Sequence, residues 1–316
     1  MVGLLLLSCR SRFERPIDVE SYVFKQPITL TMTVNDANLL RVASTLAIAE
    51  IQRLGEALDP LNNTGKLYHL NTTHKSTDPE LYGLLQQAEL ISEFTHGGLN
   101  LFVGYLEQAY GFDRMAPRPP SPSTIREILL SMKRARIDFI PERTQVNIYN
   151  DAYSITLSGI QEGYVVDQAL AHLALAGVHT ARVTLGKQMA CAASPDGLGW
   201  EYTIRDPGDG STVRELYLEN CGAATASILD KAYTYRDNSY FIHLDPKNGQ
   251  PADSMASVTV VSPSAEMSNA LARGIFIMGP QSGLALLNRM SRVEGLIIPR
   301  EGNVLISDSL YQWMGN

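Results

Sequence analysis

The segment Ser158–Asp167, which reads S-G-I-Q-E-G-Y-V-V-D, joins a strand-like run to a helix through a glycine turn. The run before it, Ser154–Leu157, alternates polar and apolar residues, as a half-buried strand does. A helix is predicted from about Gln161 to Ala176, where Gly177 closes it. Glycines at such a junction let the backbone approach a ligand closely, and the first helical turn offers free N–H groups to a phosphate. The segment predicts a strand–turn–helix unit with a binding site, although ordinary turn chemistry explains one such segment taken alone.

Further glycine-centred segments lie at the ends of strand-like runs elsewhere in the chain. They are T-H-G-G-L-N (Thr95–Asn100), L-G-K (Leu185–Lys187) and L-D-P-K-N-G-Q-P (Leu244–Pro251). Ordinary turn chemistry also explains each of these segments taken alone.

Helices and strands alternate irregularly around these segments. The period-2 run Ile28–Val34 predicts a strand, and Asp36 caps a helix that ends before Pro60. Asp78 precedes a proline at the first position of a second helix. The other predictions are a loop over 115–122 with Ser123 capping a short helix, strands at 145–149 and 180–185 and near Tyr202, Leu216, Tyr240, Val258, Leu296 and Leu305, and a helix over 265–278. This pattern favours a single α+β domain with a mainly antiparallel sheet and packed helices.

The composition excludes several classes of protein. The 316 residues include 26 Lys and Arg against 33 Asp and Glu, and no basic cluster occurs, so the chain is not expected to bind nucleic acid. No apolar run approaches the roughly 18 residues of a membrane-spanning helix. The glycine motifs of nucleotide-binding loops, the hydrolase G-x-S-x-G and the zinc-binding H-E-x-x-H are absent.

Cysteine and histidine patterns point to no metal centre. Three cysteines allow neither a disulfide framework nor a four-thiolate zinc site. Cys191 and Cys221 are interpreted as buried thiols, and a disulfide between them stays open. The six histidines lack metal-ligand spacing and are interpreted as surface or structural residues: His69, His74, His96, His172, His179 and His243.

The chain begins M-V-G-L-L-L-L-S-C, in which Leu6-Leu7-Ser8-Cys9 fits a bacterial lipoprotein signal. We expect a lipid anchor on Cys9 and a location at the cell envelope, on the outer face of the membrane. The positive start and long apolar region of a full signal are missing, which suggests that Met1 lies inside a longer signal or that the signal is decayed. A flexible apolar terminus without a signal function is the alternative. Residues 1–23 are assigned to this segment and a linker, and residues 24–316 to the folded domain.

The glycine-centred segments, taken in order, resemble one family. The order is a loop ending in Leu-Asn (61–71), G-G-L-N (97–100), S-G-I-Q-E-G-Y-V-V-D (158–167), V-T-L-G (183–186), L-D-P-K-N-G-Q-P (244–251), S-V-T-V-V-S-P (257–263) and N-A-L-A-R-G-I-F-I-M-G-P (269–280). This series is similar to the ApbE-type flavin transferases, the FAD:protein FMN transferases.

The resemblance implies a T-fold-like α+β domain that binds FAD. Such enzymes use Mg²⁺ to split the pyrophosphate and pass FMN to a threonine of a partner flavoprotein, the flavin acceptor. Carried over by position, the flavin contacts would be Leu61, Gly98, Leu99, Asn100, Thr156, Glu162 and Leu244. The metal would lie near Gly159, Asn269 and Arg273.

Two of these positions depart from the family in a way that bears on the metal. The family usually has an aspartate at position 269 and a threonine at 273, which are four apart and share a helix face. Asn269 keeps an oxygen but loses the charge that a hard dication favours. Arg273 brings a positive charge that repels an ion about 4 Å away by on the order of 4 kcal/mol per unit charge. Mg²⁺ is therefore expected to be excluded here.

Three flavin-contact positions differ as well. Asn100 and Thr156 stand where the family has aspartates, and Leu61 where it has an aromatic residue. Two interpretations remain open. The protein is either a flavin transferase in which Arg273 replaces the metal as a clamp on phosphate, or a catalytically degraded relative that binds flavin or a protein partner.

Overall fold

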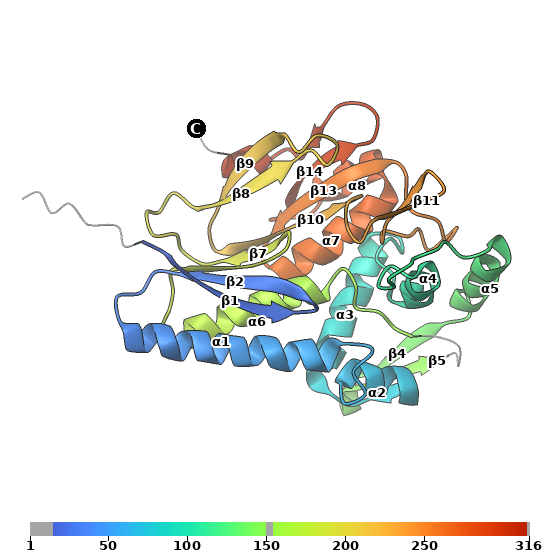
Figure 1. Cartoon of the computed structure of the whole chain (residues 1–316), viewed down its shortest axis with the longest axis horizontal. Coiled ribbons are helices and arrows are strands. Elements are labelled where there is room, and N and C mark those ends of the chain that lie inside the picture. The colour runs from blue at the N-terminus through green and yellow to red at the C-terminus, as the bar shows by residue number, and fades with distance from the viewer. Residues whose placement is uncertain (1–14, 150–153, 315–316) are drawn as a thin grey trace, which may run out of the picture.

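The computed structural model describes residues 15–149 and 154–314, and its centre is a sheet of eight strands in the order β1-β2-β6-β7-β10-β13-β14-β15 (Figure 1). Every neighbouring pair in it is antiparallel. The strands are β1 (Ile17–Val23), β2 (Gln26–Met32), β6 (Ala181–Leu185), β7 (Gln188–Cys191), β10 (Cys221–Ser227), β13 (Met255–Ser262), β14 (Glu294–Pro299) and β15 (Leu305–Ile306). The prediction of a mainly antiparallel α+β fold is confirmed.

Three long helices cover one face of this sheet: α1 (Ala37–Leu58), α6 (Gln161–Leu175) and α7 (Ala265–Met278). Helix α1 packs on α6, α6 packs on α7, and α7 lies on β10 and β13. As predicted, Asp36 caps α1 by accepting from the Asn38 N–H. Ser264 caps α7 by accepting from the Met267 N–H. The helices bury the main hydrophobic core between themselves and the sheet.

The opposite face is covered in part by a hairpin of β8 (Trp200–Arg205) and β9 (Thr212–Leu218), which lies above the sheet in Figure 1. Trp200 and Leu216 from the hairpin pack with Met189 and Val261 from the sheet in a second, smaller core. Cys191 and Cys221 are cross-strand partners in this layer, and both are buried free thiols, as predicted.

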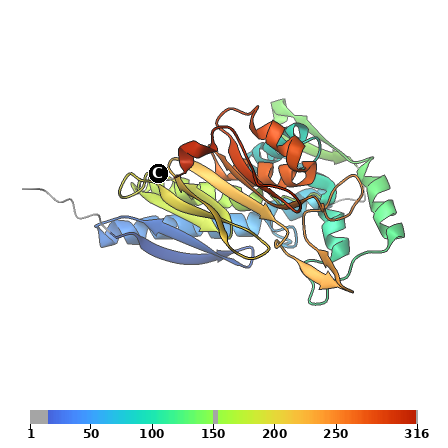
Figure 2. The same cartoon turned by 90° about the horizontal axis from the view of Figure 1, so that it is seen from above.

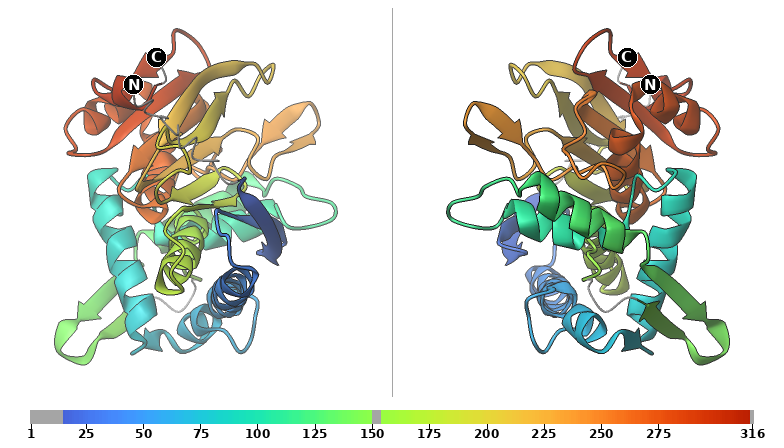
Figure 3. Two further views of the ribbon diagram at one scale, coloured as in Figure 1. Left: turned by 90° about the vertical axis from the view of Figure 1, so that its left-hand side faces the viewer. Right: turned by 90° about the vertical axis from the view of Figure 1, so that its right-hand side faces the viewer.

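The remaining elements extend the sheet–helix body at one end, as the turned view shows (Figure 2). They are α2 (Lys66–Thr73), β3 (Lys75–Ser76), α3 (Pro79–Phe94), η1 (Leu101–Val103), α4 (Gly104–Tyr110), α5 (Pro122–Met132), β4 (Arg136–Ile140), η2 (Pro141–Arg143), β5 (Gln145–Tyr149), β11 (Tyr233–Tyr235) and β12 (Asn238–Tyr240). The exceptions are α8 (Pro280–Leu287), which packs on α7 and β14, and η3 (Leu310–Trp313), which packs on β14 and β9. The β4–β5 and β11–β12 hairpins stand out from the body (Figure 3). No helix in the described ranges is long and apolar enough to span a membrane.

The structure differs from the sequence-based expectations at three places. Ser154–Leu157 is not a strand, because its backbone bonds to the Asn71 side chain and to the Leu101 carbonyl instead of to a neighbouring strand. Helix α5 starts at Pro122 and is capped by Ser121, two residues before the predicted cap Ser123. Strand β1 precedes residue 24, at which the domain was expected to start, and pairs with β2 along its full length.

Four helices meet at the carboxylate of Glu80, in the first turn of α3. It forms ion pairs with Arg53 of α1 at 2.5 Å and with Lys66 of α2 at 2.8 Å, and it accepts from the Tyr164 hydroxyl of α6 at 3.1 Å. The hydrogen bond from Arg53 outweighs the opposing effect of burial and, with Lys66, lowers the pKa of Glu80 to about 2. Glu80 therefore links α1, α2, α3 and α6 to one another.

We predict that Glu80→Gln lowers the free energy of unfolding by about 1–2 kcal/mol at pH 7, because both ion pairs are lost. The pKa of Glu80 is lowered on folding, so its contribution is present above the unfolded pKa and disappears as the pH falls from 4.5 toward 2. Urea unfolding at pH 7 and pH 3 should show a smaller acid loss for the variant than for the wild type. Glu93→Gln, exposed on the same helix, is the control, and equal acid losses in all three chains would contradict the assignment.

Candidate functional site

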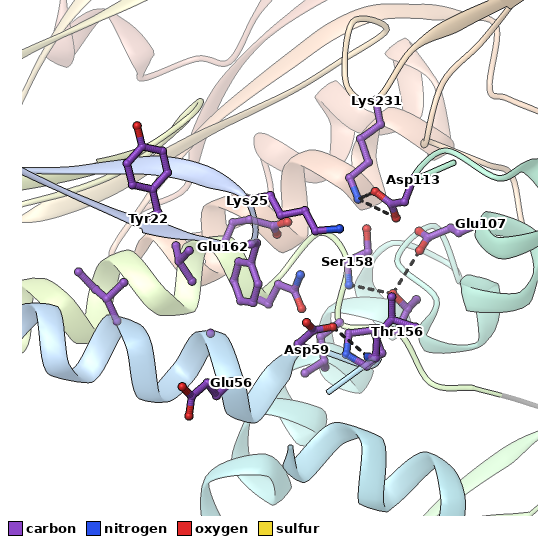
Figure 4. A pocket seen from close by; sticks show the side chains of 18 of the residues that line it. Tyr22, Lys25, Glu56, Asp59, Glu107, Asp113, Thr156, Ser158, Glu162 and Lys231 are labelled. Carbon is purple, nitrogen blue, oxygen red and sulfur yellow. Dashed lines mark hydrogen bonds and ion pairs between the residues drawn. The ribbon is translucent and has the colours of Figure 1, made fainter. Parts of the chain in front are cut away.

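A cleft opens at the end of the sheet where the β1–β2 turn meets helices α1, α6 and α7. It consists of two adjoining cavities of about 430 and 520 Å³, in the size range of ligand pockets. The residues that line both cavities are Phe24, Lys25, Asp113, Ser158, Glu162 and Lys231. Figure 4 shows Lys25 and Lys231 reaching toward this shared region from opposite sides, with Ser158 and Glu162 beside it.

Arg273 forms the floor of the second cavity and is 3% exposed. Its guanidinium donates to Ser158 Oγ and to Glu107 Oε1, each at 2.6 Å, and to the Ile242 carbonyl at 3.3 Å. Glu107, from α4, also accepts from the Thr156 hydroxyl at 3.2 Å. The charge of Arg273 is therefore balanced by a carboxylate, and the pair ties α7 to α4 and to the turn before α6.

Gly159 makes room for the Arg273 side chain. A Cβ at Gly159 would lie 2.2 Å from Arg273 Cδ, and the backbone there has a φ of +90°, which other residues rarely adopt. The first glycine of the S-G-I-Q-E-G segment is thus required by a side chain of this chain, in addition to any ligand.

Two more polar groups lie beside Arg273. Asn269 Oδ1 accepts from the Gly163 N–H at 3.2 Å, which commits its oxygen to the start of α6. Burial raises the pKa of Glu162 above its usual range, and its Oε2 is buried without a hydrogen-bond partner. Glu162 therefore favours the protonated form more than an exposed glutamate does, and it presents an unused hydrogen-bonding atom to the cleft.

These residues do not fit Mg²⁺. The Asn269 oxygen is used by a backbone N–H, and the Arg273 side chain packs against Gly159, so the three expected metal positions offer no open set of oxygens. Within residues 15–149 and 154–314, no group of three His, Cys, Asp or Glu side chains is placed to hold a metal ion. Arg273 is paired with Glu107, so repulsion by its charge is not the main effect at the expected metal position. Its side chain instead fills the space that Mg²⁺ would need.

A second polar network lines the same cavity. His243 Nε2 lies 2.9 Å from Asp230 Oδ2, and Lys187 Nζ lies 2.7 Å from Asp230 Oδ1. Burial opposes ionisation of Asp230, but the hydrogen bond from His243 and the charge of Lys187 outweigh it and lower the pKa to about 2. Burial lowers the pKa of His243, although the bond to Asp230 works against this. At neutral pH the pair is an aspartate and a neutral imidazole.

The tautomer of His243 follows from this pairing. The ionised Asp230 can only accept, so Nε2 carries the proton and Nδ1 is the unprotonated nitrogen. Nδ1 is buried and has no hydrogen-bond partner. Nδ1 is thus the basic nitrogen of His243, whose side chain lines the second cavity.

The structure brings six of the ten predicted flavin and metal positions to this cleft. Those that line it are Leu61, Thr156, Gly159, Glu162, Asn269 and Arg273. Leu61 sits on the rim and is 75% exposed, after a turn held by the bond from its N–H to Asp59. Gly98, Leu99, Asn100 and Leu244 do not line either cavity.

The four other positions lie outside the lining of the cleft, where they pack in the core or cap a helix. Gly98 lies against the Gly274 carbonyl, which a Cβ would approach to 2.4 Å, and Leu99 and Leu244 are buried in the core. Asn100 caps η1 by accepting from the Phe102 N–H. Their contact with a flavin stays a prediction.

The sequence analysis missed the residues that complete the site. Glu107 and Asp230 carry no motif, and Lys231 is paired with Asp113 across the cleft at 3.0 Å. His243 was interpreted as a structural or surface residue, yet it directly precedes the L-D-P-K-N-G-Q-P segment. Its position next to a segment that resembles the family was the sequence signal that could have marked His243 as a site residue.

Comparisons with known proteins agree with the fold and with the order of the segments. A family model described as the ApbE family matches residues 26–297. The FAD:protein FMN transferase of Haemophilus influenzae is 24% identical over 236 residues, which are 72% of this chain and 68% of that protein. The FAD:protein FMN transferase of Treponema pallidum is 27% identical over 242 residues, which are 70% of this chain and 66% of that protein.

Solved structures show the same fold. The ApbE protein of Thermotoga maritima superposes with a TM-score of 0.86 at 20% identity, covering 96% of this chain and 100% of that one. The flavin transferase ApbE of Vibrio cholerae gives a TM-score of 0.80 at 19% identity, covering 95% of this chain and 99% of that one.

We predict that Arg273→Met lowers the free energy of unfolding by about 3 kcal/mol or more, because it leaves the Glu107 carboxylate unpaired. Glu107→Gln should also destabilise the protein, and the double variant should cost less than the two single changes together, with a coupling of about 1–3 kcal/mol. Urea unfolding of the four chains measures this. The same cycle at the exposed Asp113–Lys231 pair should give about 1 kcal/mol or less, and additive effects at Arg273 and Glu107 would refute their coupling.

Proposed function

The chain belongs to the ApbE family, and from this membership we propose that it is an FAD:protein FMN transferase, which moves FMN from FAD to a threonine of a partner flavoprotein. The observation that carries the proposal is the cleft itself. It brings the expected flavin contacts Leu61, Thr156 and Glu162 to the same place as Arg273 and a buried, oriented His243.

Among the basic side chains of the cleft, Lys25 suits the pyrophosphate of FAD best. Lys25, Lys187, Lys231 and Arg273 line it, and Lys25 forms none of the ion pairs found in the described residues. Lys25 stands in the β1–β2 turn and extends over the shared region of the two cavities (Figure 4). We assign Lys25 to the phosphates, because the Arg273 guanidinium is already bound to Glu107 and Ser158, and Lys231 is paired with Asp113.

Mg²⁺, which the family resemblance leads one to expect, has no place in this proposal. Arg273 and Glu107 supply a fixed link between α7, α4 and the Ser158–Gly159 turn at the expected metal position. We propose that this ion pair keeps the cleft in shape without a metal.

The proposed reaction uses His243 as the proton acceptor. The threonine oxygen of the partner protein bonds to the phosphorus of the FMN half of FAD, and the bond from that phosphorus to the AMP half breaks. The hydroxyl proton passes to His243 Nδ1, and AMP leaves. Asp230 holds the ring in the orientation and tautomer that this step needs.

A second candidate function is flavin binding without transfer. It is favoured by one observation, that the expected metal position is filled by a paired arginine. An arginine stabilises charge but does not activate a hydroxyl as a metal does, so transfer depends on His243 alone in this chain.

We predict that the protein with FAD and a flavin-acceptor domain adds the mass of FMN to the acceptor, equally in Mg²⁺ and in EDTA, because no step uses a metal. Mass spectrometry of the acceptor measures the transfer, and fluorescence titration measures FAD binding. His243→Gln should bind FAD within about twofold of the wild type but lower the transfer rate by about 100-fold or more. Because burial lowers the pKa of His243, transfer should persist below pH 6.5.

The outcomes separate the two candidate functions. An FAD-titratable protein whose acceptor keeps its mass supports flavin binding alone, and a protein that binds no FAD refutes both. As the complementary variant, Asn269→Asp combined with Arg273→Thr should become dependent on Mg²⁺. If it gains no Mg²⁺ affinity, the placement of the family's metal position is incorrect.

We also propose that the protein is a lipoprotein of the cell envelope, anchored through Cys9. The support is the Leu4–Cys9 sequence, which lies outside the described residues. Cells fed labelled palmitate should incorporate label into the wild type and none into Cys9→Ser. Absence of label from the wild type would refute the anchor.

A further inference from the structure

A separate cavity of about 470 Å³ lies between the sheet and the β8–β9 hairpin, on the face opposite helices α6 and α7. Alternate residues of β6 define the two faces: Val183 and Leu185 point into the helix-covered core, whereas Arg182 and Thr184 line this cavity. His243, Asn269 and Arg273 do not line it, so it is distinct from the flavin cleft, although Gly186–Gln188, Thr225 and Leu229 line both.

The sheet face under the hairpin is divided into an apolar part and a polar part. The apolar part, with Met189 and Val261, is packed against Trp200 and Leu216 of the hairpin. The polar part carries Thr225, Thr259, Ser227 and Ser257, and it borders the cavity. Burying a hydroxyl group costs free energy unless the group is hydrogen-bonded, so each hydroxyl of this layer requires a partner.

Most of these hydroxyls have a partner within the protein. Tyr202 and Thr225 share a hydrogen bond of 2.7 Å, as do Thr225 and Thr259. Ser257 is the exception in this layer: it is 1% exposed, it lines the cavity, and its Oγ has no hydrogen-bond partner. A ligand group that reaches Ser257 would satisfy it.

Arg182 is the second unpaired group of the cavity. Its guanidinium lies over the Trp200 ring at 5.2 Å, and it donates weakly to the Glu201 carbonyl at 3.4 Å. Its Nε is buried without a partner, and Arg182 takes part in none of the ion pairs of the described chain. A guanidinium with free donors at a cavity wall matches a carboxylate or phosphate, whose oxygens accept two parallel N–H bonds.

We propose that this cavity is a second binding site, for a small organic anion whose carboxylate or phosphate binds Arg182 and whose other polar group bonds to Ser257. Met189, Ile204 and Leu229 on its wall provide contact for an apolar body between the two ends. The proposal does not depend on flavin binding, because none of its argument uses the flavin cleft.

Calorimetric titration of the protein with 4-hydroxyphenyl phosphate, 4-hydroxyphenylacetate and the neutral 2-phenylethanol tests the proposal, because both anions carry a hydroxyl group for Ser257 at the end opposite the anionic group. At least one of the two anions should bind with one-to-one stoichiometry, and the tighter of them identifies the preferred anionic group. Arg182→Met should weaken that binding at least tenfold and Ser257→Ala at least threefold. Arg214→Met removes an exposed arginine of β9 outside the cavity and should leave binding unchanged.

Lys25→Ala distinguishes this cavity from the flavin cleft. An anion that binds in the cleft would lose affinity in Lys25→Ala and keep it in Arg182→Met, and that result would overturn the proposal. Failure of both anions to bind, or equal binding of 2-phenylethanol, would overturn it too. Thermal unfolding checks that Arg182→Met is folded, and Ser257→Ala, which removes only one oxygen, provides an independent measure.

Discussion

The close contact between helices α6 and α7 is the constraint on which the rest of the molecule depends. A Cβ at Gly163 of α6 would lie 2.2 Å from the Ala265 carbonyl, so only glycine permits this approach. Four residues further along α6, Asp167 accepts the backbone N–H groups of Ala265 and Glu266 and holds the first turn of α7. Positions 159, 163 and 167 thus meet 273, 269 and 265 in reverse order. The segment Ser158–Asp167 fixes both the packing of α7 and the side chains that α7 presents to the cleft.

The contact between α6 and α7 also determines which charged groups lie at the floor of the cleft. Because Gly159 has no side chain, Arg273 extends past it to reach Glu107 and Ser158. The result is a buried ion pair without net charge between α7 and α4. Its two residues, Arg273 and Glu107, are 166 positions apart in the sequence. A buried pair of this kind is costly to break at either end, so it holds α7, α4 and the Ser158–Gly159 turn in place. Among the basic side chains that line the cleft, Lys25 alone takes part in none of the ion pairs of the described residues.

Local signals in the sequence predicted much of this fold, and long-range contacts account for what was missed. Asp36 and Asp78 were correctly predicted as helix caps, because a cap depends only on the next three residues. The glycines of the Ser158–Asp167 segment were predicted to let the backbone approach a ligand, and in the structure Gly159 and Gly163 make room for Arg273 and for the Ala265 backbone. Glu107 was missed, because its role depends on a partner far along the chain. The period-2 pattern at Ser154–Leu157 misled for the same reason: alternation predicts a half-buried extended segment, but a strand also needs a neighbour to pair with.

The pairing of Arg273 with Glu107 restricts the mutational paths open to this sequence. Replacing Arg273 alone leaves a buried carboxylate unpaired, and replacing Glu107 alone leaves a buried guanidinium unpaired. Each single substitution therefore gives a less stable protein. A side chain introduced at Gly159 collides with Arg273, which ties a third position to the other two. A return to metal ligands would therefore require coordinated changes on α7 and α4. Descendants of this chain are expected to keep all three residues together or to lose them together, as a single inherited unit.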